Sequence, residues 1–353
     1  MTLNIPRCRR LIESAIGSFA LDLSGLVVLT EAATNHFSLT PLIAALAGAD
    51  RVIALGRDSH YGSLASVKDE LVGVAKAWGM ADLIVVTGDR RDSALSRADV
   101  VTNLGFVRPL DAAFLGQLKP SASVSLMWET WEFRPVDLDI QACRRLGIPV
   151  LGTNEDHPDL QIFTYLGQVA MKLLFELDVE VFRSRIVVIG SGKFAASIGR
   201  VLLKLGAGAV DVLEPGTNRR ECFRKADAIL VAEHQIGDLL LGPGGWLDPR
   251  WLAEINPGVG VAHICGKVDQ LSLAQAGLRH TPSRLADAGY MSVTTDYVGP
   301  RPLIDLHAAG LKVGEMLTRC RLRGMSAVES ELEVLRSSLL AQGFDDFHSP
   351  LLL

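Results

Sequence analysis

Cysteine is scarce in this sequence, and its distribution excludes two common structural devices. Only five cysteines occur among 353 residues, and no two of them form a CxxC pair. An odd, scattered set argues against a disulfide framework and against a zinc knuckle, and it fits a reducing cytoplasm. The histidines add no metal signature, because neither an HxxxH nor an HExxH pattern occurs. We therefore expect a cytoplasmic protein without a metal site.

The chain also lacks charged blocks and long apolar runs. Its formal net charge is −5 and its basic residues are not clustered, so neither nucleic acid nor an anionic membrane surface is a favoured partner. No charge-free stretch approaches the roughly 20 residues that a membrane-spanning helix needs. A short basic patch at 7–10 is not followed by an apolar segment, which argues against a signal peptide. These absences favour a soluble, intracellular protein that acts on a small molecule.

Short apolar runs that alternate with helical segments predict α/β construction with parallel sheets. In the first part of the chain, strands are expected at 26–30, 51–55, 82–87, 99–103, 124–127 and 149–152. Helices are expected between them, at 40–47, 64–78, 109–118 and 138–146. Thr40 and Pro41 suit a helix start, and Gly147 suits a helix end. This region is predicted to form one complete doubly wound domain.

A second α/β segment follows a long helix that is expected at 161–178. A helix to 205 should follow a glycine turn, with strands at 185–190, 210–213, 228–231, 260–263 and 291–295. The segments 303–319 and 328–342 are expected to be helical and to contribute no strand. The chain exceeds the roughly 250–300 residues at which single cores stop growing, so we expect two domains. The predicted fold is a Rossmann dinucleotide-binding domain, 161–297, inserted in a flavodoxin-like outer domain formed by 1–160 plus 298–353.

The strongest motif is the glycine-rich turn Gly190–Ala195 (GSGKFA), which joins a predicted strand to a predicted helix. In a GxGxxA turn, the first glycine permits the tight turn, the second lets backbone approach a pyrophosphate, and the small last residue allows close helix packing. Glu214 ends the next strand, 19 residues after Ala195, where a carboxylate binds the adenosine ribose and repels a 2′-phosphate. Arg219 and Arg220 keep NADP as a less favoured alternative, and a glycine turn without a ligand is another. The motif predicts NAD, held by Gly190, Ser191, Gly192, Lys193, Phe194, Ala195, Glu214 and Ala232.

Two further stretches resemble a known superfamily. Residues 132–154 (EFRPVDLDIQACRRLGIPVLGTN) resemble the segment that precedes the cofactor domain of D-2-hydroxyacid dehydrogenases; the matching positions are Asp137, Gly147, Ile148, Val150 and Asn154. Residues 225–229 and 266–269 are similar to the KADIIV and GHFD segments of S-adenosylhomocysteine hydrolase. The chain therefore resembles the formate/glycerate dehydrogenase-like superfamily. This resemblance implies an NAD domain inserted in a flavodoxin-like domain, and a homodimer.

The sequence departs from the dehydrogenase pattern at both catalytic positions. Those enzymes hold the substrate carboxylate with an arginine in an NxxRG turn, whereas this chain has Gly266 there, with Lys267 beside it. They also use the histidine of a late TPH segment as acid and base, whereas this chain has Thr294-Thr295-Asp296. The resemblance thus implies the scaffold of a hydroxyacid dehydrogenase without its arginine and its histidine.

Side chains at the ends of the predicted strands are the candidates for binding and chemistry, because doubly wound folds bind ligands there. In the outer domain, the candidate substrate-binding residues are Glu31, Thr34, Asn35, His36, Arg57, Asn103 and Glu129. Candidates for the proton transfer that accompanies hydride transfer are Lys267, His263, Asp296 and His307, with His234 as a further one. Structural alternatives stay open, namely helix caps for Ser38 and Thr40, a solvated loop for Arg57, and structural roles for the histidines.

The pattern as a whole predicts an NAD-dependent oxidoreductase that acts on a small polar, anionic metabolite in a cleft between two domains. One alternative is an enzyme in which tightly bound NAD oxidises the substrate transiently, without net redox change. Another is a non-catalytic NAD-binding sensor or subunit. Retention of stoichiometric NAD by the purified protein, with turnover when none is added, would distinguish the first alternative.

Overall fold

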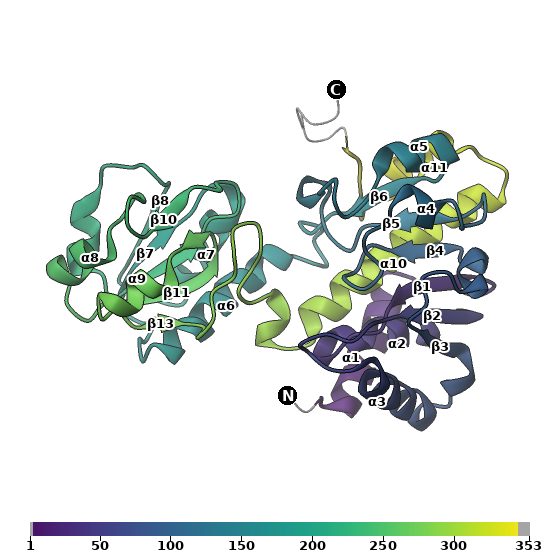
Figure 1. The fold of residues 1–353 in the computed structure, drawn as a ribbon, viewed down its shortest axis with the longest axis horizontal. Helices are drawn as coiled ribbons and strands as arrows, with labels where there is room; N and C mark the ends of the chain where they lie inside the picture. Colours follow the sequence, from purple (N-terminus) through teal and green to yellow (C-terminus); the bar gives the residue numbers. More distant parts are fainter. Residues whose placement is uncertain (1–2, 345–353) are drawn as a thin grey trace. The chain divides into compact units, whose positions relative to one another are not determined.

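The computed structural model describes residues 3–344. The chain divides into two compact units, one formed by the residues up to Leu160 together with those from Pro300 onward, the other by Gln161–Gly299. We call them unit 1 and unit 2, and Figure 1 shows their elements. Each unit has a largely parallel sheet with helices around it, which confirms the predicted α/β class with two doubly wound sheets. Within the described residues, no helix is long and apolar enough to cross a membrane.

A seven-stranded sheet lies at the centre of unit 1 (Figure 1). Its order is β14 (Ala341–Gln342), β6 (Val150–Thr153), β5 (Ser123–Ser125), β4 (Val100–Thr102), β1 (Val27–Glu31), β2 (Arg51–Leu55) and β3 (Ile84–Thr87). All neighbours pair in parallel except β14, which runs antiparallel to β6. The strand order reverses between β1 and β4. Strands β2, β1, β4, β5 and β6 follow the five-stranded flavodoxin-like order, and β3 is an additional strand beside β2. Ligands of such sheets bind at this reversal, so the ends of β1 and β4 are the positions to examine.

Helices cover the sheet of unit 1 and end where local chemistry stops them. They are α1 (Ile5–Ser18), α2 (Leu39–Leu46), α3 (Leu64–Ala77), α4 (Ala112–Leu115), α5 (Ile140–Leu146), α10 (Arg301–Leu322) and α11 (Ala327–Ser337). Gly147 adopts φ 66° at the end of α5, as predicted for a terminating glycine. Glycines also let α10 approach the sheet, because a Cβ on Gly314 would lie 2.4 Å from Cγ1 of Val100. The long helix therefore packs directly on the central strands.

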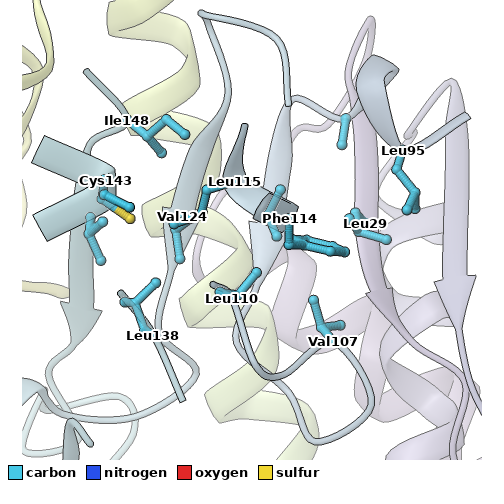
Figure 2. Close-up of a cluster of buried hydrophobic side chains, with 14 of the residues drawn as sticks. Leu29, Leu95, Val107, Leu110, Phe114, Leu115, Val124, Leu138, Cys143 and Ile148 are labelled. Carbon is cyan, nitrogen blue, oxygen red and sulfur yellow. The ribbon is translucent and has the colours of Figure 1, made fainter. Parts of the chain in front are cut away.

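One apolar core of unit 1 lies between the sheet and the short helices α4 and α5 (Figure 2). Leu29 of β1, Val124 of β5 and Phe114 of α4 are buried in it. Cys143 of α5 belongs to the same cluster, and burial raises the pKa of its thiol to about 12. This cysteine is therefore a neutral, apolar packing group.

Two predictions about unit 1 are wrong. The C-terminal segment does contribute a strand, β14, and the side-chain oxygen of Gln342 accepts a hydrogen bond from the Thr130 amide at 2.7 Å. A two-residue edge strand is too short to show periodicity, so no sequence pattern reveals it. Thr40 does not open α2, which begins at Leu39; its hydroxyl lies 2.7 Å from Nδ1 of His307 on α10. Ser38 makes no side-chain cap either, since its hydroxyl donates to the carbonyl of Asn35.

Unit 2 is built on a five-stranded parallel sheet. Its order is β13 (His280–Thr281), β11 (Gly260–Cys265), β9 (Ala228–Ala232), β7 (Arg185–Ile189) and β8 (Ala209–Leu213). A separate pair joins β10 (Leu239–Leu241) to β12 (Lys267–Val268). The helices are α6 (Ile162–Glu176), α7 (Gly192–Lys204), α8 (Pro249–Ile255) and α9 (Gln270–Gln275). The strand order reverses between β7 and β9, which places the switch point of this sheet at the glycine turn.

The prediction of a strand at 291–295 is wrong. Met291 makes only an isolated bridge to Cys265, and the short helix Thr295–Val298 begins at the end of the predicted segment. The edge position is taken by β13, which pairs with β11. The segment 291–295 (MSVTT) alternates as an exposed strand would, whereas the two residues of β13 are too few to be recognised.

Candidate functional site

The glycine turn of unit 2 has the backbone geometry that a close-approach turn requires. Gly190 follows β7, and a Cβ there would lie 2.3 Å from the carbonyl oxygen of Ala232 at the end of β9. It would also lie 3.0 Å from Cβ of Ala195, which is fully buried in α7. Gly192 has φ +61°, a left-handed conformation that strains other residues. Any side chain at position 190 would therefore separate β7, β9 and α7.

The N-terminus of α7 lacks a side-chain cap from the residue that precedes the helix. Ser191 precedes this 13-residue helix, and its side chain makes no capping hydrogen bond to the first turn. The amide groups of the first turn thus have no side-chain cap from Ser191, and the helix dipole adds positive potential there. Lys193 lies in the same turn, with its Nζ 4.1 Å from the centre of the Phe163 ring. These features suit a phosphate group.

Two glutamates stand on either side of the glycine turn, because β7 lies between β8 and β9. Glu214 directly follows β8 and is exposed. Glu233 directly follows β9 and is buried, at 1% exposure. The distance of Glu214 from the turn along the chain makes it recognisable in the sequence. No such signal marks Glu233, whose place depends on the pairing of β9 with β7.

The Glu233 carboxylate is held against the turn through one oxygen. Its Oε1 accepts hydrogen bonds from the Ser191 hydroxyl at 3.0 Å and from the amides of Gln235 at 2.6 Å and Ile236 at 3.1 Å. Its Oε2 is buried and has no hydrogen-bond partner among residues 3–344. The ring of the adjacent His234 lies 4.8 Å from the Phe194 ring, and burial lowers the pKa of this histidine. The loop after β9 thus packs against the glycine turn through Glu233 and His234.

Arg219 and Arg220, the two residues that favour NADP as the alternative cofactor, both interact with other side chains of the protein. Arg219 forms an ion pair with Asp211 at 2.8 Å. The guanidinium of Arg220 lies 5.0 Å from the centre of the Trp251 ring, which places it in cation–π range. Neither guanidinium is therefore reserved for a 2′-phosphate.

His263, one of the candidate proton-transfer groups, is fully buried in β11 and has both ring nitrogens engaged. Nε2 lies 2.8 Å from the carbonyl oxygen of Gly266, which only accepts, so Nε2 carries the proton. Nδ1 lies 2.7 Å from the hydroxyl of Ser292, and that hydroxyl accepts from the amide of Ala286. The ring is therefore held as one neutral tautomer, and burial lowers its pKa.

The other three candidates for proton transfer are placed differently. Lys267 lies at the start of β12 and is exposed, next to the Gly266 carbonyl that His263 binds. Asp296 lies in the short helix Thr295–Val298 of unit 2 and accepts a hydrogen bond from the Thr294 hydroxyl. His307 belongs to unit 1, where it is buried on α10 beside Thr40. His263 of β11 and Lys267 of β12 are thus linked only through Gly266, whose carbonyl accepts the hydrogen bond from His263.

Unit 1 has polar groups at its own switch point. Glu31 ends β1 and is 4% exposed, and its Oε2 accepts a hydrogen bond from the Phe106 amide at 3.1 Å. Burial raises the pKa of this carboxyl to about 7, although the Phe106 amide and the charge of Arg108 act in the opposite direction. Asn103 follows β4, and its Oδ1 accepts from the Met127 amide at 2.8 Å. Glu31 is therefore a carboxyl group that changes charge near neutral pH.

The remaining predicted substrate residues of unit 1 differ in availability. Thr34 is half-buried and Asn35 is exposed, whereas His36 is buried. Arg57 is exposed after β2, with its guanidinium 5.6 Å from the centre of the Phe106 ring. Glu129 is fully buried and accepts hydrogen bonds from the Trp131 indole and the Glu155 amide. Arg57 is thus an exposed cation beyond the end of the strand that neighbours β1, while Glu129 serves local structure.

The fold matches solved structures at low sequence identity. Dipicolinate synthase from Bacillus subtilis has a TM-score of 0.53 and 12% identity, and the match covers 86% of this chain and 99% of that one. Dipicolinate synthase from Bacillus halodurans has a TM-score of 0.50 and 12% identity, with coverage of 81% and 96%. The pyruvate reductase of Chlamydomonas reinhardtii has a TM-score of 0.50 and 10% identity, with coverage of 84% and 97%.

These similarities extend over most of the chain and show that it shares the two-domain α/β fold of these proteins. No protein-family model matches the sequence, and the comparison with curated proteins gives no match.

Proposed function

We propose that this chain is an NAD-dependent oxidoreductase that acts on a small polar, anionic metabolite, as a cytoplasmic homodimer. The observation that carries this proposal is the turn at the switch point of unit 2, where Gly190 permits close approach of β9 and Gly192 opens α7. Backbone amides at such a turn suit the pyrophosphate of a dinucleotide. A neighbour in fold that is described as a pyruvate reductase supports a small anionic substrate.

The residues around the turn fit NAD better than NADP. Exposed Glu214 accepts hydrogen bonds from ribose hydroxyls and repels a 2′-phosphate. Arg219 and Arg220, which would attract that phosphate, are engaged by Asp211 and Trp251. When bound, the nicotinamide ring supplies the hydride acceptor. The first-turn amides of α7 would hold the pyrophosphate, with Lys193 beside them.

Lys267 is the group that we propose to move the proton. Lys267 is exposed and lies at the start of β12, directly after Gly266. In the dehydrogenase pattern the substrate-binding arginine occupies the position of Gly266, so Lys267 is its neighbour along the chain. His263 then acts as a positioning residue, because its Nε2–H group holds the Gly266 carbonyl that precedes Lys267. Asp296 and His307 remain weaker candidates, because each is already hydrogen-bonded to a neighbouring hydroxyl.

Unit 1 supplies the substrate-binding groups in this proposal. The exposed Arg57 provides a cation for an anionic substrate. Glu31, whose pKa is about 7, donates a hydrogen bond when protonated and accepts one when ionised. The loop with Thr34 and Asn35 adds a hydroxyl and an amide next to the end of β1.

The test is turnover of small 2-oxo and 2-hydroxy acids with NADH or NAD, followed by the absorbance of the reduced cofactor. We expect Lys267→Met to lower turnover by about 100-fold or more, the range for a lost general acid or base. Its NAD affinity should stay within about twofold of wild type. Lys204→Met, at the exposed end of α7, is the matched control and should behave as wild type. Tight NAD binding without oxidation or reduction of any tested acid would contradict the proposed oxidoreductase.

A further inference from the structure

The Glu233 carboxylate is an unusual group for a phosphate-binding turn. It is buried and carries three hydrogen bonds on Oε1, while Oε2 has no partner among residues 3–344. A buried carboxylate oxygen without a hydrogen bond is costly, so such a group indicates a donor that is supplied from outside the chain. Phosphate oxygens are acceptors and carry negative charge, so they cannot be this donor. The hydroxyl groups of a sugar can.

The strand order decides which sugar would be near. The glycine turn follows β7, Glu214 follows β8 on one side, and Glu233 follows β9 on the other. A dinucleotide has the same layout, with a pyrophosphate in the middle and one ribose on either side. If Glu214 binds the adenosine ribose, as its spacing from the turn indicates, the carboxylate on the opposite side faces the other ribose.

We propose that Oε2 of Glu233 accepts a hydrogen bond from a hydroxyl of the nicotinamide-side ribose. This inference rests on the proposed function, because it presupposes that a dinucleotide binds at the turn. The Ser191 hydroxyl is an integral part of the site, since it ties Oε1 to the glycine turn and so fixes the direction of Oε2. The site thus selects ligands that carry a second sugar beyond the pyrophosphate.

Three ligands separate this role from general binding at the turn. NAD and ADP-ribose both contain the second ribose, whereas ADP lacks it. A hydrogen bond to a charged acceptor is worth roughly ten- to a hundredfold in affinity. Calorimetric titration of the nucleotide-stripped full chain should therefore show that wild-type protein binds ADP-ribose at least about tenfold more tightly than ADP.

Glu233→Gln tests the residue itself. The amide oxygen can keep the three hydrogen bonds of Oε1, while the NH2 group replaces the acceptor Oε2 by a donor. We expect this variant to bind NAD and ADP-ribose about tenfold more weakly and to bind ADP as tightly as wild type or more tightly, because a negative charge near the phosphates is gone. Glu254→Gln, an exposed glutamate on α8, is the matched control and should bind all three ligands as wild type does.

The outcomes distinguish this inference from the proposed function. If wild-type protein binds NAD but prefers ADP-ribose to ADP by less than about twofold, the inference is overturned and the cofactor site stands. It is likewise overturned if Glu233→Gln weakens ADP and ADP-ribose equally, since the carboxylate would then only shape the turn. If wild-type protein binds none of the three ligands, the proposed function fails together with the inference.

Discussion

Replacement of Glu31 by glutamine should change how the stability of unit 1 depends on pH. Burial raises the pKa of the Glu31 carboxyl from 4.5 to about 7, so the folded protein binds this proton more tightly than the unfolded chain does. The resulting stabilisation is fully present below about pH 4.5 and is lost as the pH rises through about 7. Each pH unit of pKa change corresponds to about 1.4 kcal/mol, so the loss is on the order of 3 kcal/mol.

The Glu31→Gln variant stays neutral at every pH, and its amide oxygen can still accept the hydrogen bond from the Phe106 amide. It should therefore melt like wild type near pH 5 and at a higher temperature near pH 8. For a unit of this size, 1 kcal/mol shifts the melting temperature by about 2–4 °C, so we expect a difference of roughly 6–12 °C at pH 8. Differential scanning calorimetry at several pH values measures this, because it resolves the transitions of a two-domain chain.

Glu70→Gln, which replaces an exposed glutamate on α3, is the matched control for the same charge change. Its melting temperature should follow that of wild type across the whole pH range. If Glu31→Gln loses stability between pH 5 and pH 8 as steeply as wild type does, Glu31 titrates as an ordinary surface carboxylate. The description of a desolvated carboxyl at the end of β1 would then be wrong.

Two further substitutions test the glycine turn and the locked histidine. Gly190→Ala should destabilise unit 2 by about 1–3 kcal/mol or more and abolish NAD binding, because the new Cβ would lie 2.3 Å from the carbonyl oxygen of Ala232. Gly17→Ala is the control and should have neither effect, because a Cβ at this position of α1 would meet no atom within 4 Å. Thermal melts measure the stability of the variants, and titration measures their affinity for NAD. A Gly190→Ala variant that is as stable as wild type and binds NAD would show that β9 does not approach position 190 so closely. Ser292→Ala should destabilise the protein by about 1–3 kcal/mol, because Nδ1 of buried His263 loses its donor. In the wild-type protein, NMR titration should show that His263 protonates below its ordinary pKa of 6.5, and protonation above that value would contradict the neutral tautomer.

The cofactor turn is predictable from sequence because its geometry is local. The glycines at 190 and 192 and the alanine at 195 act within six consecutive residues, and the strand and helix beside them have strong apolar patterns. Most long elements are predictable for the same reason, although their boundaries differ by a few residues. Gly147 is an example, since a left-handed glycine ends α5 where the sequence indicates it.

The features that the sequence does not reveal depend on contacts between distant segments. Glu233 gains its importance only through the pairing of β9 with β7, which brings it against Ser191, 42 positions away along the chain. The partner of His263 is Ser292, which lies in a segment whose pattern wrongly predicts a strand. Thr40 has the features of a helix cap, yet it contacts His307, which is 267 positions away. Periodicity and spacing report local geometry, so they cannot show such partners.

Titration of the nucleotide-stripped full chain with NAD, NADH, NADP and NADPH measures whether unit 2 binds a dinucleotide, and which one. We expect micromolar binding of NAD and NADH, weaker binding of the two phosphorylated forms, and relaxation toward NADP in Glu214→Ala. Gly192→Val should lose this binding, because position 192 has φ +61° and its Cβ would lie 3.3 Å from Nε2 of Gln235. If no dinucleotide binds to the wild-type protein, the glycine turn has only a structural role and the account of unit 2 as a cofactor-binding unit is contradicted.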